Sequence, residues 1–210
     1  MYYITKCPKI NSSSTIQIII FLIKIQMDSQ QSEYYLAIDV GKVNMGYAIY
    51  DGTNIGFNVL NIEKNISKES SRTQSAKYCK IEVLDKWFDH ILKQYNIKKV
   101  IIEQQVIGNV AATIIQSIIE TICYMKKIEC VEFAAADKFK YLNPQYDTKK
   151  REHKKIATEY ARNILRNHNI SLTTFNKFPK KDDISDAICM SFMTYQEDQK
   201  DVDKIIRFLK

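Results

Sequence analysis

Residues 35–50 read YLAIDVGKVNMGYAIY, two apolar runs on either side of a short polar segment. The first run ends at a single carboxylate, Asp39, and the second begins after Gly46. This pattern predicts a strand, a turn and a returning strand, with Asp39 at the end of the first strand. A charge beside a buried strand is costly unless it is paired or binds a metal, so Asp39 is a candidate metal ligand.

The segments that follow extend this hairpin into a larger sheet. Residues 55–62 predict a third strand, antiparallel because its connection is short. Apolar residues at three- and four-residue steps predict a long amphipathic helix over 81–95. Residues 99–103 predict a strand that again ends in a carboxylate, and 129–134 predict a fifth strand. A second helix is expected between these two strands, with Asn109 as its N-cap.

The second half of the chain is expected to be mainly helical. Residues 137–147 predict a short helix and a loop, 151–168 an amphipathic helix and 170–175 an extended segment. A last long helix is expected to begin around Asp183, after Pro179. Strands alternating with helices in the middle of the chain imply parallel crossovers. We therefore expect an α/β fold, a five-stranded mixed sheet with helices on both faces.

Three segments are expected along the chain. Residues 1–34 form an N-terminal extension, in which Met27 is the candidate start of translation. Residues 35–196 form the folded domain, and residues 197–210 form a charged C-terminal helix or tail. The apolar run 16–25 is half as long as the roughly 20 residues that a membrane span needs, so no membrane association is expected.

Charge and cysteine content narrow the function further. The 210-residue chain has a formal net charge of +7, which favours a polyanionic partner. The excess is local, because residues 137–181 hold 12 Lys and Arg against 4 Asp and Glu. The five cysteines are dispersed and contain no Cys-x-x-Cys pair, so free thiols in a reducing compartment are expected rather than disulfides or a zinc site.

Four carboxylates lie where a shared cation site is expected. Asp39 and Glu103 each end a strand, at the edge where sites form in open sheets. Asp183 and Asp186 lie one turn apart at the start of the last helix, about 5–6 Å apart at Cβ. Each also has a plain explanation, as a turn residue, a solvated strand end or a helix cap, so the prediction rests on all four together. Oxygen-only ligands select Mg²⁺ or Mn²⁺, and two such ions suit phosphodiester hydrolysis.

A basic helix face accompanies these carboxylates. Four cations of the 151–168 helix fall within roughly 60° of one another, and no anion is expected among them. These four are Arg151, Lys155, Arg162 and Arg166. A phosphate-binding surface is favoured over an ordinary solvated face. The residues expected to contact DNA are Lys149, Lys150, Arg151, Lys154, Lys155, Arg162, Arg166, Lys180 and Lys181.

Three motifs resemble the RuvC-type Holliday junction resolvases of the RNase H superfamily. DVGKVNMGYA from Asp39 resembles the family's first motif, VIIEQQ from Val100 its second, and KKDDISDA from Lys180 its third. The EQQ and KKDD details resemble most the branch of poxviruses and large DNA viruses, with the mitochondrial branch next. The resemblance covers residues 35–195, most of the chain.

The resemblance implies an RNase H-like fold and a structure-selective DNA endonuclease. Such an enzyme makes paired symmetric nicks at four-way junctions, in DNA recombination and repair or in the resolution of viral replication intermediates. The implied metal ligands are Asp39, Glu103, Asp183 and Asp186. They would hold two Mg²⁺ ions, with Mn²⁺ able to substitute. The family's catalytic lysine corresponds either to Lys150 or to Lys154, which the sequence leaves open.

The resemblance also implies partners and a location. A homodimer would bind branched DNA, and no small-molecule cofactor is expected. A viral protein would act in the host cytoplasm; the alternative location is the mitochondrion. Three other functions stay open: an RNase H-like nuclease on other branched or hybrid substrates, a non-catalytic junction-binding protein, and a nucleotide-binding domain of the actin and sugar-kinase type. The intact carboxylates argue against the second, and the chain is short for the two lobes of the third.

Overall fold

The structure is a computed structural model that describes residues 32–66, 76–105, 108–135 and 150–208. The chain divides into two compact units, Met1–Ser32 and Glu33–Lys210, and the second holds every element described below. The predicted helix and loop over 137–147 lie outside the described residues.

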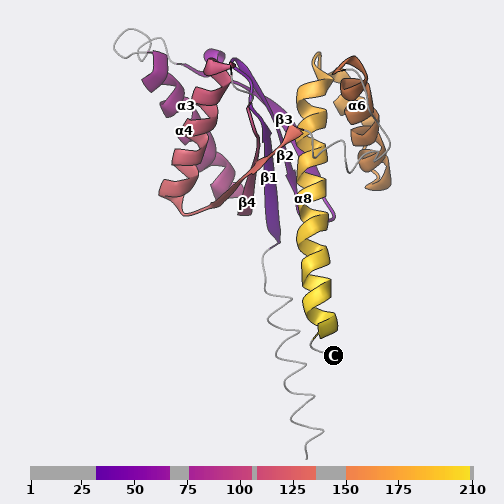
Figure 1. The fold of residues 1–210 in the computed structure, drawn as a ribbon. Helices are drawn as coiled ribbons and strands as arrows, with labels where there is room; N and C mark the ends of the chain where they lie inside the picture. Colours follow the sequence, from indigo (N-terminus) through magenta and orange to yellow (C-terminus); the bar gives the residue numbers. More distant parts are fainter. Residues whose placement is uncertain (1–31, 67–75, 106–107, 136–149, 209–210) are drawn as a thin grey trace, which may run out of the picture. The chain divides into compact units, whose positions relative to one another are not determined.

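The second unit is built on a five-stranded sheet of order β3-β2-β1-β4-β5 (Figure 1). β1 (Glu33–Asp39) is central and pairs antiparallel with β2 (Asn44–Tyr50), which pairs antiparallel with β3 (Ile55–Asn61). On its other side β1 pairs parallel with β4 (Asn96–Glu103), and β4 pairs parallel with β5 (Glu129–Phe133). The predicted mixed sheet is confirmed.

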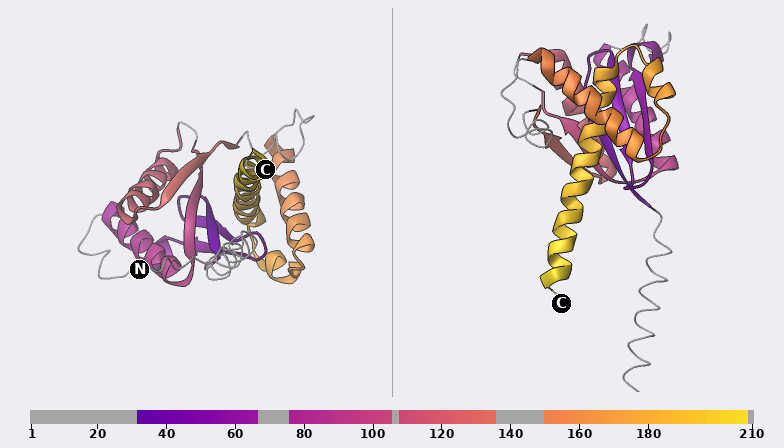
Figure 2. Two further views of the ribbon diagram at one scale, coloured as in Figure 1. Left: turned by 90° about the horizontal axis from the view of Figure 1, so that it is seen from below. Right: turned by 90° about the vertical axis from the view of Figure 1, so that its right-hand side faces the viewer.

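Helices cover both faces of this sheet, as predicted (Figure 1). α3 (Ala76–Gln94) and α4 (Val110–Lys126) pack on one face. α8 (Lys181–Phe208) crosses the other face against β1 and β2, and α6 (Lys150–Asn167) packs on α8. Figure 2 shows these layers in two further views. The remaining elements are the short helix α7 (Leu172–Lys177) and the 3-10 turn η1 (Glu63–Asn65).

Three local predictions differ from the structure. Residues 170–175 were expected to be extended, yet α7 begins at Leu172, because the Ser171 hydroxyl caps it by accepting a hydrogen bond from the Thr173 amide and Phe175 is buried. Asn109 is at the N-cap of α4, but it accepts through its backbone carbonyl rather than its side chain. α8 continues without a break through residue 197, where a separate charged helix or tail was expected.

Two broader expectations concern thiols and membranes. The four cysteines among the described residues carry free thiols, and three of them are buried. Within the described ranges, no helix is long and apolar enough to cross a membrane.

Candidate metal centre

Side-chain alternation brings Asp39 and Glu103 to the same face of the sheet. Ala37 of β1 and Ile101 of β4 pack together with Met190 of α8. Side chains two positions apart on a strand point to the same face. Asp39 follows Ala37 and Glu103 follows Ile101 by two positions, so both carboxylates face the side covered by α8.

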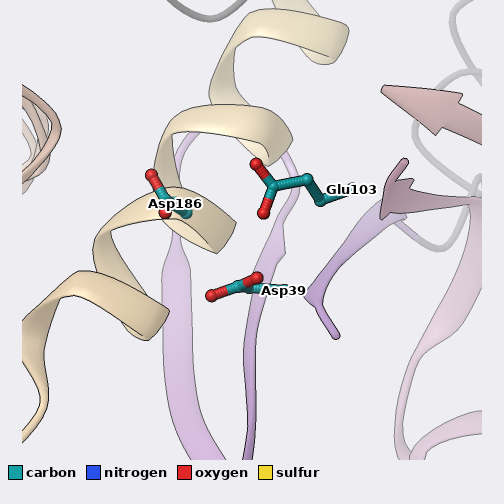
Figure 3. A group of neighbouring side chains, drawn as sticks. All are labelled: Asp39, Glu103 and Asp186. Atoms are coloured by element: carbon teal, nitrogen blue, oxygen red, sulfur yellow. The ribbon is translucent and has the colours of Figure 1, made fainter. Parts of the chain in front are cut away.

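Strand pairing and α8 then bring three carboxylates together. Ile38 pairs with Ile102 in the parallel β1–β4 ladder, so Asp39 and Glu103 end neighbouring strands at one edge of the sheet. Asp186 enters from the second turn of α8. Ligand oxygens of Asp39, Glu103 and Asp186 all lie within 4.8 Å of one another, and all three residues are half-buried. Figure 3 shows them arranged around a shared space between the strand ends and the helix.

Gly46 allows α8 to come this close. Gly46 is buried in β2 and pairs with Asp39 across the hairpin. A Cβ at this position would lie 2.4 Å from the carbonyl oxygen of Asp183. Only glycine therefore permits the observed approach of the first turn of α8 to the sheet. The sequence analysis used Gly46 only to mark the start of the second apolar run. A glycine inside a strand often indicates close approach of another backbone, so this signal could have predicted its role.

Asp183 lies one turn before Asp186 and is not part of the group of three. It lines a small hollow of about 110 Å³ whose wall includes Asn44, Phe178 and Lys180. Burial raises the pKa of Asp183, and the charge of Asp182 raises it further against the opposing effect of Lys180. Of the four predicted ligands, the structure thus brings three together and leaves Asp183 beside them.

Lys154 of α6 lies at the same end of α8. Its Nζ donates to Asp182 Oδ2 at 2.5 Å. This hydrogen bond raises the pKa of Lys154, and the nearby charges of Asp183 and Asp186 add to the shift. Burial acts to raise the pKa of Asp182, but the hydrogen bond from Lys154, a backbone hydrogen bond and the charges of Lys154 and Lys180 together lower it. Of the two candidate catalytic lysines, Lys154 is close enough to Asp183 and Asp186 for their charges to raise its pKa. The Lys150 side chain lies outside the described residues.

A hollow of about 590 Å³ opens between α6 and the start of α8. Four of the cations predicted to contact DNA line it: Lys154, Lys155, Arg162 and Lys181. Lys180 precedes Lys181 and is exposed. Its positive charge acts to lower the pKa of Asp183. Arg151 has no described side chain and Lys149 lies outside the described residues. Glu159 and Asp182 also line the hollow, which leaves an excess of two cations to meet a phosphate backbone.

The prediction that no anion lies among the four cations of α6 is wrong for Arg162 and Arg166. Arg162 Nη1 lies 3.1 Å from one oxygen of Glu159, and Arg166 Nη1 lies 3.3 Å from the other. Glu159 is three residues before Arg162, so it shares that face of α6. The stripe is therefore partly neutralised around Arg162 and Arg166.

Two solved structures share this architecture. T. thermophilus RuvC in complex with Holliday junction substrate matches with a TM-score of 0.53 and 11% identity, over 76% of this chain and 90% of that chain. The Thermus thermophilus RuvC structure matches with a TM-score of 0.53 and 10% identity, over 75% of this chain and 90% of that chain. The RNase H-like fold is thus confirmed, and with the three carboxylates it defines an RNase H-like domain with an acidic group suited to a metal.

A match over most of the sequence identifies the family. A family model described as the poxvirus A22 protein matches residues 33–198, and the chain belongs to this family of poxvirus Holliday junction resolvases. No curated protein sequence matches it. The resemblance predicted from three short motifs is confirmed, and with it the assignment to hydrolytic endonucleases of the resolvase class.

Proposed function

We propose that this chain cleaves four-way DNA junctions by metal-dependent hydrolysis, with Asp39, Glu103 and Asp186 as metal ligands. The observation that carries the proposal is the convergence of these carboxylates within 4.8 Å at the edge of the sheet. Three like charges at such a spacing disfavour one another, whereas a shared cation makes the arrangement favourable. Carboxylate oxygens suit Mg²⁺, for which Mn²⁺ can substitute.

The chemistry divides between the ions and the chain. Two bound metal ions would activate a water as the nucleophile and stabilise the leaving oxygen. The chain supplies the geometry: Asp39 and Glu103 are fixed on neighbouring strands, and Asp186 is fixed on a helix packed against those strands. Ligands held by packed strands and helices need little rearrangement when the transition state forms, which favours catalysis.

Asp183 and Lys154 complete the proposed site. Asp183 is the fourth ligand in this proposal, because a three-residue step on α8 puts its carboxylate within reach of an ion shared with Asp186. A bound cation would oppose the burial and repulsion that raise its pKa. Lys154, held by Asp182, would offset negative charge at the scissile phosphate, and Lys150 lies one turn before it on α6.

The basic hollow between α6 and α8 is the proposed DNA contact. Lys155, Arg162 and Lys181 line it beside Lys154, so the phosphates of one arm would reach the carboxylates from this side. Backbone contacts carry no sequence information, which suits an enzyme that recognises a branch point by shape. In a poxvirus family, the site of action would be the viral replication site in the host cytoplasm.

A homodimer would place two such sites on one junction. Among the described residues, the large exposed apolar side chains lie on α3 and α4, on the face of the sheet away from α8: Tyr78, Val110, Ile114, Tyr124 and Met125. Two of them, Ile114 and Met125, line one groove of about 380 Å³ together with Ile118 and Ile122. Exposed apolar patches are typical of protein contacts. Light scattering of the full chain distinguishes the dimer from a monomer.

The test compares the wild type with Asp39→Asn. The full chain is incubated with Mg²⁺ and a labelled four-way junction, beside a linear duplex and an RNA–DNA hybrid. The wild type should make paired nicks near the branch point, and EDTA should prevent them. Asp39→Asn should lose cleavage by at least about 100-fold, since even the outer partners of metal ligands are each worth about 10–100-fold. Junction binding should persist, because the basic hollow is unchanged.

Asp89→Asn is the matched control, because Asp89 is an exposed carboxylate on α3, across the sheet from α8. It should cleave like the wild type. Cleavage by Asp39→Asn at the wild-type rate would overturn the metal site. Cleavage of the hybrid alone would keep the site and discard the junction as substrate. Junction binding by a wild type that cleaves nothing would favour the non-catalytic binding protein.

A further inference from the structure

Gln116 is a buried polar side chain with no part in the function proposed above. It lies on α4, on the opposite face of the sheet from α8, with 8% of its surface exposed. Buried polar groups cost free energy unless they are hydrogen-bonded, so its partners indicate what it does.

Both ends of the Gln116 amide are engaged. Its Oε1 accepts a hydrogen bond from the backbone N–H of Gln105 at 3.1 Å. Its Nε2 donates to Glu120 Oε1 at 2.8 Å and to Glu132 Oε1 at 3.1 Å. The partners fix which end is which, because an N–H faces the oxygen and two carboxylates face the nitrogen. One side chain thus links α4, β5 and the segment after β4.

The segment that Gln116 holds is the one that follows Glu103. Gln104 still donates its N–H to the Phe133 carbonyl of β5 at 3.0 Å. Gln105 lies beyond the end of β4, and its N–H donates to the Gln116 side chain. The Gln105 side chain in turn donates to the Glu103 carbonyl at 3.1 Å. These contacts fix the backbone directly after a proposed metal ligand.

We propose that Gln116 is a positioning residue of the metal centre. By holding the backbone of Gln105, it keeps the end of β4 in place and the Glu103 carboxylate aimed at Asp39 and Asp186. The inference rests on the proposed function, since it takes these carboxylates as the metal ligands. Outer partners that orient metal ligands tune metal affinity without touching the ion.

Three variants separate positioning from general stability. Gln116→Met keeps the volume of the side chain and removes both hydrogen-bonding ends. Ile122→Val is the matched control, since Ile122 lies on the same helix in the apolar core with 1% exposed. The triple change of Gln116→Glu with Glu120→Gln and Glu132→Gln exchanges donor and acceptor across both amide contacts and keeps an oxygen for the Gln105 N–H.

Three readouts are made on the full chain: Mn²⁺ binding by calorimetric titration, the thermal melting temperature and the Mg²⁺ dependence of junction cleavage. Gln116→Met should weaken Mn²⁺ binding by about tenfold, the lower end of the range for outer partners. Ile122→Val should lower the melting temperature and leave Mn²⁺ binding unchanged. The triple variant should recover most of the Mn²⁺ affinity. In junction cleavage, Gln116→Met should raise the half-saturating Mg²⁺ concentration much more than it lowers the rate at saturating Mg²⁺.

Wild-type Mn²⁺ affinity in Gln116→Met would overturn the inference. An equal loss of affinity in Ile122→Val would overturn it as well, because the effect would then follow stability. The proposed function fails separately: a wild type that binds Mn²⁺ but cleaves no junction would refute the nuclease, while a loss of Mn²⁺ binding in Gln116→Met would still support the positioning role.

Discussion

α8 meets the central strands at two ends, and the two contacts have opposite electrostatics. At its start, Asp186 converges with two other carboxylates, Asp39 and Glu103, within 4.8 Å. Three turns further along the same helix, Asp198 lies 2.9 Å from the Nζ of Lys99 on β4. We refer to these as the site end and the paired end of α8. Carboxylates are gathered at one end, and a carboxylate meets a cation at the other.

The pKa values of the two ends move in opposite directions. At the paired end, burial acts to raise the pKa of Asp198, but the hydrogen bonds from Lys99 and Tyr35 and the charges of Lys99 and Lys98 together lower it. At the site end, burial and the charge of Asp182 raise the pKa of Asp183. The paired end therefore contributes stability as it stands, whereas the site end has a cost that a bound cation would offset. This difference is typical of a structural contact and a functional one.

The largest effect is expected from Gly46→Ala, which breaks the site end. The added Cβ would lie 2.4 Å from the Asp183 carbonyl, so the start of α8 must move away from the sheet. Overpacking of this kind costs about 1–3 kcal/mol of unfolding free energy. Since Asp186 moves with the helix, Mn²⁺ affinity and junction cleavage should fall as well. Urea unfolding and Mn²⁺ titration measure the two losses.

Gly56→Ala is the control for this change. Gly56 is exposed on β3, and a Cβ there would meet nothing within 4 Å. Its stability, Mn²⁺ affinity and cleavage should match those of the wild type. If Gly46→Ala behaves like Gly56→Ala, close packing of α8 on β2 does not set the geometry of the metal centre.

An intermediate effect is expected from Asp198→Asn, which breaks the paired end. Loss of the charge weakens the bonds from Lys99 and Tyr35, at 2.9 and 2.8 Å. Hydrogen bonds to charged groups are worth about 1.5–3 kcal/mol, and partial exposure reduces this, so a loss of about 1–2 kcal/mol is expected. Cleavage should stay at the wild-type rate at temperatures where the variant is folded. A fall in cleavage without a fall in stability would show that the two ends are not independent.

The sequence predicted the site end better than the paired end. Asp39 and Glu103 could be placed because each closes a short apolar run, and such runs predict buried strands. Asp183 and Asp186 followed from helical spacing. The contact between Lys99 and Asp198 spans 99 residues and leaves no local pattern, so it was not predicted. The same holds for Gln116, whose partners lie on α4, on β5 and in the segment after β4.

Failures of the prediction have one cause, which is that local patterns do not report contacts. Residues 170–175 look extended in isolation, yet burial of Phe175 and the Ser171 cap favour helix α7. Helical spacing put four cations on one stripe but did not weigh Glu159, which pairs with Arg162 and Arg166. Helical spacing also did not distinguish Asp186, which lies with Asp39 and Glu103, from Asp183, which lies outside this group of three.

The smallest effect is expected from Asp183→Asn. It tests whether a carboxylate at the site end changes stability in the opposite direction to Asp198 at the paired end. Because the pKa of Asp183 is raised above its ordinary 3.8 in the folded chain, the folded state binds a proton more tightly than the unfolded state. Stability from this group is present below pH 3.8 and is lost as the pH rises through the raised pKa. In EDTA at pH 7, Asp183→Asn should therefore be more stable than the wild type, and the gain should vanish in acid.

Asp198→Asn should be less stable than the wild type at pH 7, and this loss of stability should disappear as the pH falls through the lowered pKa of Asp198. Urea unfolding from pH 3 to pH 7 measures both, and the same sign for both variants at pH 7 would refute the electrostatic contrast between the two ends of α8.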